Sequence, residues 1–492
     1  MKSSPQASSV GRPINPNKPQ AKSTKKGLSL PSWETIVETG LLRRIITTLG
    51  LLGFYRLGVQ IPLSGVHQEK LKLLFGANGN NLLSFIDLFA GGALSALSVF
   101  ALGIGPYITA SIMMQLLNEV FPQLKALQQE HGESGRKEYQ QWVRRLSLIL
   151  ALIQAFALTK FLYLSGVVDT TDSAWLFYPK SIISLMAGSV FVMWIGELIS
   201  EFGIGNGGSL LIFAGIAARL PKLITQTIES VNVGTTPLWG AIALTLFYAL
   251  VIIGIIYLQE GARKLLIVGA RTNAASPSTT SHYLPLKVNP AGVLPIIFAS
   301  ATMYLPMQLI SFVTGKPNAP LSQGFGHVFL ETKFLKPIFQ PLMNNPMIAN
   351  FFTAIGGSID RIFGYATWEH SLAYLAIIVL FAFFYSSILL NPREMAENLQ
   401  KGGNAIQGIK PGKPTGEYIE YILNRIVFIG ALCIGLITIL PTHMEKICQV
   451  TTLGALGSTS LIIMVGVAND LYNQVMAYSQ AHQYKVRSLL SK

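Results

Sequence analysis

The run NLLSFIDLFAGGALSALSVFALGIGPYITASIMMQLLN, residues 81–118, contains one formally charged side chain, that of Asp87. A straight helix crosses the hydrocarbon core of a bilayer in about 20 residues, so this run is nearly twice too long for a single span. Glycine pairs and Gly-Pro steps interrupt helices, and the run contains Gly91, Gly92 and a Gly-Pro step. Broken backbone persists in a membrane only where protein buries it or where it lines a water-filled cavity. The run therefore predicts a short helix at 82–97 and a spanning helix at 98–117 that meet inside a pore or a transporter.

The composition of the whole chain is that of a polytopic membrane protein. Half of its 492 residues are hydrophobic and only 12% are charged, whereas a soluble domain carries about 25% charged residues. The net charge of +14 is explained by basic loops on the cytoplasmic side, so it does not indicate nucleic-acid binding. Of the two cysteines, Cys433 lies in an apolar run, and no disulfide framework is expected. Residues 1–40 are polar and basic, without a cleavable signal peptide, and are typical of a disordered cytoplasmic arm.

Hydrophobic runs predict an all-α membrane protein with ten transmembrane helices. The predicted spans are 42–63, 98–117, 146–165, 181–199, 210–228, 238–258, 289–313, 372–390, 426–441 and 455–476. They divide into two halves of five, 41–228 and 238–479, of which the second must run in the opposite sense. This is the parity of inverted-topology repeats, whose site lies between the halves.

The distribution of Lys and Arg predicts that both termini are cytoplasmic. Most of these residues fall on one side of the membrane if the N-terminal arm and the tail at 480–492 are inside. Two long basic loops, 259–288 and 391–424, then project into the cytoplasm, and orientation signals alone would account for them. The segment 314–370 forms an outer loop.

Catalytic motifs are missing from the chain. It has no HExxH, no Gly-x-Ser-x-Gly and no phosphate-binding loop, and the glycine-rich 203–209 is better explained as a tight turn. The ionisable residues of the spans, such as Arg56 and Asp470, lie towards span ends, which disfavours an ion-coupled transporter. We therefore expect no enzyme activity, cofactor or metal. An inverted-repeat secondary transporter of a small solute and an intramembrane enzyme or insertase-like scaffold are the alternatives.

Five segments resemble the SecY family of protein-conducting channels, part of the Sec translocon. They are FAGGALSALSVFALGIGPYITASIMMQLL (89–117), GIGNGGSLLIFAGI (203–216), LPLKVNPAGVLPIIFAS (284–300), NPREMAENLQKGGNAIQGIKPGKPT (391–415) and GSTSLII (457–463). The resemblance covers about residues 41–479. It implies a gated pore through which unfolded preproteins cross the membrane, with a lateral gate that releases hydrophobic segments into lipid.

The resemblance also implies four groups of site residues. An isoleucine ring closes the pore by dewetting, and it maps to Ile104, Ile108, Ile212, Ile216, Ile297 and Ile463. Pattern alone would make these isoleucines ordinary packing residues. A plug at 84–97 lies below the ring and includes Phe85, Ile86, Asp87, Leu88 and Phe89, with Gly91 and Gly92 as a hinge. The lateral gate would carry a polar cluster of Thr109, Gln154 and Asn289, joined by hydrogen bonds across the closed gate. The two basic loops would dock a motor or a ribosome through Arg263, Lys264, Lys410 and Lys413.

The implied partners are small membrane subunits of the SecE and SecG type, the SecA motor ATPase or the ribosome, preprotein signal sequences and the lipid bilayer, with no direct binding to DNA. Lys410 departs from the family, which usually has Arg in Gly-Ile-Arg-Pro-Gly, and this substitution keeps the charge but loses bidentate geometry.

The long outer loop and the polar arm resemble cyanobacterial and plastid members. We therefore expect a thylakoid membrane of a plastid (cyanelle or chloroplast), or a cyanobacterial plasma or thylakoid membrane, with both termini cytoplasmic or stromal.

Overall fold

The structure is a computed structural model. It describes residues 40–67, 87, 90–121, 123–124, 132–164, 166–168, 174–269, 282–303, 362, 367–450 and 457–490. Outside the described residues lie most of the outer loop, residues 1–39 of the predicted arm at 1–40, and the plug residues Phe85, Ile86, Leu88 and Phe89.

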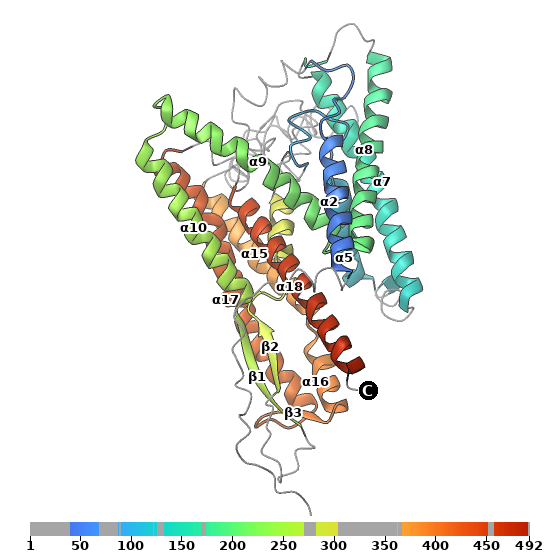
Figure 1. Cartoon of the computed structure of the whole chain (residues 1–492), viewed down its shortest axis with the longest axis vertical. Helices are drawn as coiled ribbons and strands as arrows, with labels where there is room; N and C mark the ends of the chain where they lie inside the picture. Colours follow the sequence, from blue (N-terminus) through green and yellow to red (C-terminus); the bar gives the residue numbers. More distant parts are fainter. Residues whose placement is uncertain are drawn as a thin grey trace, which may run out of the picture.

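Long helices make up most of the described chain (Figure 1). They are α2 (Leu41–Gly58), α5 (Gly105–Val120), α7 (Gly132–Leu164), α8 (Ala174–Phe202), α9 (Gly207–Asn232), α10 (Leu238–Glu260), α15 (Trp368–Leu389), α16 (Pro392–Lys401), α17 (Lys413–Ile447) and α18 (Gly457–Leu490). A shorter apolar helix spans Leu294–Met303. Most of these helices start or end a few residues from the predicted boundaries, while α7, α17 and α18 extend well beyond the predicted spans.

Six of the described helical stretches are long and apolar enough to cross a membrane. They are those of α7, α8, α9, α10, α15 with α16, and α17. The helix α2 carries three arginines, α5 has 16 residues, and α18 is only mildly apolar. The structure is therefore that of a polytopic helical membrane protein, and the number of ten spans stays a prediction.

The described helices form two groups that meet at α9. Within the first group α5 packs on α7, α7 on α8, and α8 on both α2 and α9. In the second group α17 contacts α10, α15, α16 and α18. The helix α9 belongs to the first group but also contacts α10 and α18, and Figure 1 shows it running between the two. One hydrophobic core continues through both groups.

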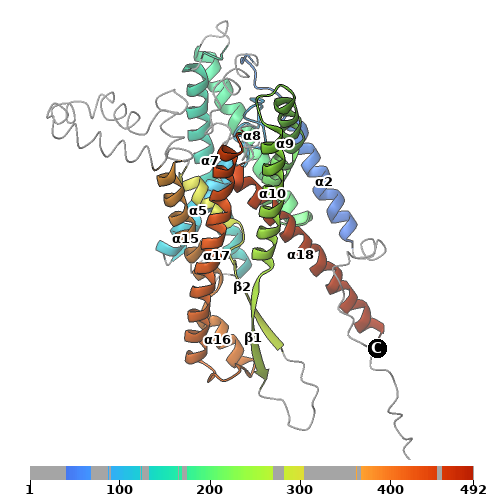
Figure 2. The ribbon, with the colours of Figure 1, turned by 90° about the vertical axis from the view of Figure 1, so that its left-hand side faces the viewer.

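The prediction of an all-α fold was wrong in one place, because the two basic loops form a small sheet. Strands β1 (Ala262–Gly269), β2 (His282–Lys287) and β3 (Asn404–Ile406) pair antiparallel in the order β2-β1-β3. Leu265, Leu286 and Ile406 point into a second core against the N-terminal half of α17, which stabilises strands that would otherwise be exposed loops. The sheet and α16 project together from one end of the helical body (Figure 2).

The opening stretch is less helical than predicted. Residues 90–104 form successive turns, and α5 begins only at Gly105. Gly91, Gly92, Leu97 and Gly103 have positive φ angles, which an α-helix cannot contain. Pro106 lies at the first turn of α5, where its missing N–H costs nothing. We refer to residues 90–104 as the turn segment.

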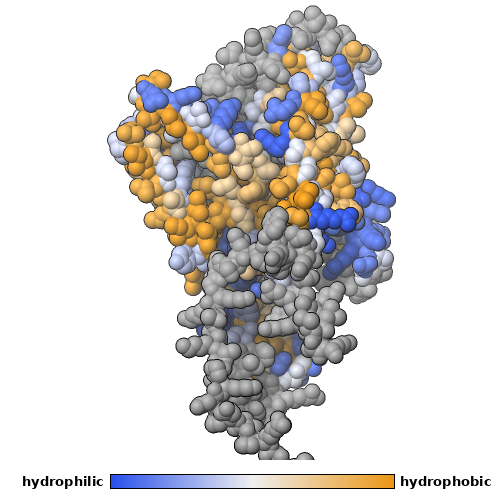
Figure 3. All heavy atoms as spheres, viewed as in Figure 1, coloured by the Kyte–Doolittle hydropathy of each residue, from blue (hydrophilic) through white to orange (hydrophobic). Residues whose placement is uncertain are grey.

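The outer surface of the helices is strongly apolar (Figure 3). Exposed large side chains include Leu246, Leu250 and Ile253 along α10. A soluble protein would not expose such continuous apolar faces, so these side chains face lipid.

Candidate functional site

The turn segment is bound by main-chain hydrogen bonds to the residues that follow α2 (Leu41–Gly58). The amide of Leu63 donates to the carbonyl of Leu97 at 2.8 Å, and the amide of Val99 donates to the carbonyl of Ile61 at 3.0 Å. The hydroxyl of Tyr55 donates to the carbonyl of Ala90 at 3.2 Å. These bonds satisfy irregular backbone that has no ladder of its own.

Asp87 organises the start of this segment. Its Oδ1 accepts hydrogen bonds from the amides of Leu94 and Ser95, both at 2.9 Å. Its Oδ2 forms an ion pair with Nη2 of Arg219 on α9 at 2.6 Å. The carboxylate is fully buried, whereas the side chain of Arg219 is 23% exposed. The predicted plug residue Asp87 therefore ties the turn segment to a helix 132 residues away in sequence.

A second arginine holds the same segment from the side of α2. Nη1 of Arg56 donates to the carbonyl of Gly91 at 2.8 Å. The sequence indicated Arg56 only as a residue near a span end, and it gave no prediction for Arg219. The available signal was the single aspartate in an otherwise uncharged run. A buried carboxylate needs a cationic partner, so this residue pointed to an arginine or lysine elsewhere in the chain.

Glycines bring the turn segment into direct backbone contact with α9. A Cβ atom at Gly215 would lie 2.5 Å from Cα of Gly91, and one at Gly91 would lie 2.5 Å from Oη of Tyr55. Gly91 thus occupies a tight contact in a left-handed conformation, with φ of 67°. Its predicted role as a hinge stays a prediction.

The six predicted ring isoleucines all belong to the main core. Ile104, Ile212, Ile216, Ile297 and Ile463 are buried there, and Ile108 packs against the same cluster. Ile104 is the residue before α5, Ile212 and Ile216 lie on α9, and Ile463 lies on α18. Side chains from both helix groups therefore belong to the same continuous core as the buried residues of the turn segment. Their role as a pore constriction stays a prediction.

The predicted gate residues Thr109, Gln154 and Asn289 show no hydrogen bonds to one another in the described part of the chain. The hydroxyl of Thr109 donates to the carbonyl of Gly105 at 3.0 Å, and Nδ2 of Asn289 donates to the carbonyl of Gly292 at 2.7 Å. Both side chains thus bond locally.

A different pair of side chains joins the two helix groups, between α5 and α15. The hydroxyl of Tyr385 on α15 donates to Oε1 of Gln115 on α5 at 2.7 Å. The ring of Tyr385 stacks on Phe298 with centroids 4.7 Å apart, so the hydroxyl is held in place. The sequence prediction missed this bond, because it joins residues 270 positions apart.

The predicted docking residues converge on the small sheet. Arg263 and Lys264 lie on β1, opposite Leu286 and Pro285 of β2, with exposed side chains. Lys410 follows β3, and Lys413 is the first residue of α17. The loops 259–288 and 391–424 are joined by the pairing of β1 with β3, so their charges belong to one structural unit.

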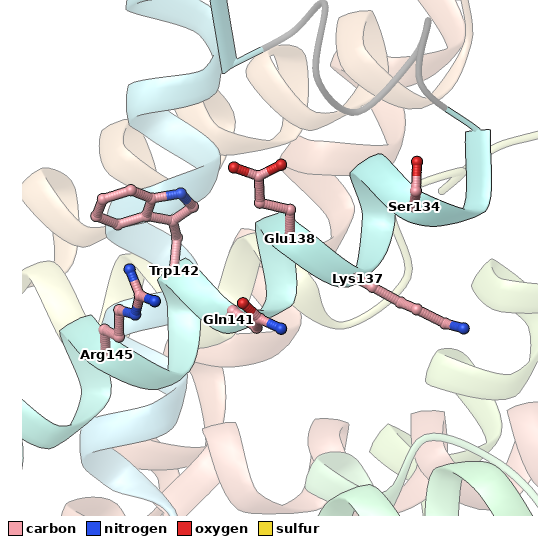
Figure 4. A pocket seen from close by; sticks show the side chains of 6 residues that line it. All are labelled: Ser134, Lys137, Glu138, Gln141, Trp142 and Arg145. Atoms are coloured by element: carbon pink, nitrogen blue, oxygen red, sulfur yellow. The ribbon is translucent and has the colours of Figure 1, made fainter.

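A separate hollow of about 380 Å³ lies on the polar start of α7 (Figure 4). One helix face lines it, with the guanidinium of Arg145 5.2 Å from the ring centroid of Trp142. None of its lining residues belongs to the core that holds the isoleucines. This hollow is therefore not part of the candidate pore.

Comparisons with known proteins agree with this architecture. The SecY family model matches residues 98–472. The protein translocase subunit SecY of Synechococcus elongatus is 40% identical over 91% of this chain and 94% of its own length. The SecY subunit of Pyropia yezoensis is 37% identical over 91% and 98% of the two chains.

Solved structures show the same fold. A SecY channel whose plug domain stabilises the closed state and maintains a membrane seal has a TM-score of 0.59 at 18% identity, covering 92% of this chain and 94% of that one. The canine Sec61 channel in its ribosome complex has a TM-score of 0.56 at 19% identity, with the same coverage.

The fold and the apolar helices define an integral membrane protein of the protein-conducting channel class, which transports and does not catalyse. Within that class, this chain belongs to the SecY family.

Proposed function

We propose that this chain is the pore-forming subunit of a protein translocase and that unfolded preproteins cross the membrane between its two helix groups. The observation that carries the proposal is the position of the turn segment. Irregular, buried backbone lies in the same core as the predicted ring isoleucines, which come from both helix groups. Branched apolar side chains offer water and ions no hydrogen bonds, so such a ring seals by dewetting and yields to a passing chain.

In this proposal the ten spans form two inverted halves of five, and Ile104, Ile108, Ile212, Ile216, Ile297 and Ile463 form the constriction. The segment from residue 84 to 97 is the plug. Release into lipid occurs between α5 and α7 on one side and α15 with the helix Leu294–Met303 on the other. In this proposal Thr109, Gln154 and Asn289 are the polar residues of the gate. Tyr385 of α15 and Gln115 of α5 are joined by a hydrogen bond across it.

The partners follow from the same scheme. A canine relative of this fold is found on the ribosome, and exposed basic residues of the sheet supply a docking surface for the ribosome or for the SecA motor ATPase. Small subunits of the SecE and SecG type complete the channel. Relatives from a cyanobacterium and from Pyropia yezoensis support a cyanobacterial or thylakoid membrane. The distribution of Lys and Arg supports termini that are both cytoplasmic or stromal.

Site-specific photo-crosslinking to a stalled preprotein tests the proposal. A photoreactive side chain in place of Ile216 should form adducts with the stalled chain. The matched control is Ile253 on α10, which is 55% exposed on the apolar outer surface and should react with lipid. An absence of adducts at Ile216 during active export would contradict the path between the helix groups. Solute-dependent uptake into vesicles would instead favour the small-solute transporter.

A further inference from the structure

The ion pair between Asp87 and Arg219 does more than neutralise a buried charge. Asp87 is fully buried, and its carboxylate accepts two backbone amides of the turn segment as well as the guanidinium of α9. Its own carbonyl also accepts the amide of Gly92 at 2.9 Å. One side chain thus holds the internal fold of the segment and its attachment to α9.

Arg219 lies on the same face of α9 as the predicted constriction. It follows Ile212 by seven residues and Ile216 by three, a spacing that aligns side chains along one helix face. Gly215, beside them, receives the backbone of Gly91. The same stripe of α9 therefore carries two ring residues, the glycine contact and the arginine.

The contacts of the segment with α2 and with α9 differ in kind. The attachment to the α2 end uses several main-chain bonds together with Tyr55 and Arg56. Among the described residues, the polar attachment to α9 is the single pair of Asp87 with Arg219. Because α9 also contacts α10 and α18 of the other helix group, a movement between the groups would strain this pair while the bonds to α2 remain.

We propose that Arg219 is a positioning residue that holds the plug in the closed position through Asp87. Movement of α9 would then release the plug. This inference rests on the proposed channel function. In the closed state the pair keeps the turn segment against α9. When a translocating chain moves the second helix group, the contacts of α10 and α18 with α9 shift α9 relative to α2. The pair then breaks, and the segment moves away from α9 while it stays bound on the α2 side. The pair therefore sets how strongly a client must engage before the seal opens.

Ion conductance of the reconstituted translocase in planar bilayers tests this role. Arg219→Leu should raise the resting open probability about 10-fold or more, because it leaves a buried carboxylate without its cation. Arg219→Lys should restore most of the seal, since a single charged donor is retained. Lys222→Leu, which removes an exposed charge one turn further along α9, should change nothing.

Client selectivity and coupling provide the decisive readouts. Asp87→Asn should leak like Arg219→Leu, and the double variant should leak no more than either single variant. Export of a preprotein with a weakened signal sequence should rise in the leaky variants. Independent, multiplicative effects of the two substitutions, or failure of Arg219→Lys to reseal, would show that the residues do not act through each other.

Deletion of residues 85–96 separates this inference from the proposed function. If the channel leaks after the deletion but stays sealed with Arg219→Leu, the proposed role of the Asp87–Arg219 pair is refuted and the channel assignment stands. A channel that stays sealed in both refutes the assignment of the plug itself.

Discussion

At the scale of single residues, the proposed seal depends on a close contact between Gly215 and Gly91 that a larger residue would disturb. A methyl group at Gly215 would lie 2.5 Å from Cα of Gly91, so Gly215→Ala must displace the turn segment or bend α9. In a helix interior alanine is about 1 kcal/mol more favourable than glycine, so α9 itself should remain folded. We expect a several-fold higher resting ion conductance with export retained, measured on the reconstituted channel in planar bilayers.

The matched control for this prediction is Gly254→Ala on α10. A Cβ atom there would meet its nearest neighbour, Cδ1 of Ile437, at 3.8 Å, which is ordinary contact. This variant should conduct like the wild type. A tightly closed Gly215→Ala channel would show that the segment does not need direct contact with α9.

The same residues show where prediction from sequence stops. The uncharged run with its lone Asp87 predicted broken, buried backbone, and the turn segment has that character. Its partner Arg219 was not predicted, because periodicity reports which face a residue occupies and not which distant residue lies opposite. The bond between Gln115 and Tyr385 was missed for the same reason.

At the scale of elements, helices were predicted well and strands were missed. Long apolar runs have few alternatives in a membrane, so spans such as α10 (Leu238–Glu260) began and ended near the expected residues. The strand β1 (Ala262–Gly269) lies in a basic loop, and its second partner β3 comes from a loop over 130 residues later. Such pairing depends on the core against α17, which local sequence does not reveal.

Because β1 pairs with β3, the basic residues of the two loops lie on one sheet and their role in docking can be tested together. Arg263→Glu with Lys264→Glu should weaken binding of the ribosome or the motor by about 10-fold at low salt and by less at high salt, since exposed charges are screened. Both side chains are exposed, so the sheet should persist. Binding isotherms over a salt series measure the effect. Arg136→Glu, an exposed charge on α7, should have little effect, and unchanged binding of the sheet variant would contradict the docking role.

At the scale of the whole molecule, the two helix groups are connected differently at two faces. The short link from α9 to α10 and the contacts of α9 with α10 and α18 keep the groups together on one side. At the face of α5 and α15, the described polar contact is the single bond between Tyr385 and Gln115. One such bond in a membrane contributes on the order of 1 kcal/mol. The molecule should therefore open at the second face and pivot at the first.

A covalent link across the weak face should abolish this opening. Cys433 and Cys448 are both free and are first replaced by serine. Gln115→Cys with Tyr385→Cys, joined by a cleavable bis-maleimide, should block the release of hydrophobic segments into lipid, and cleavage should restore it. Crosslinking of stalled membrane-protein chains to lipid measures release. The control link, Ala382→Cys with Val427→Cys, joins α15 to α17 within one group, where the two residues share a core cluster. It should leave release intact, because only movement between the groups opens the gate. Undiminished release from fully linked channels would place the exit elsewhere.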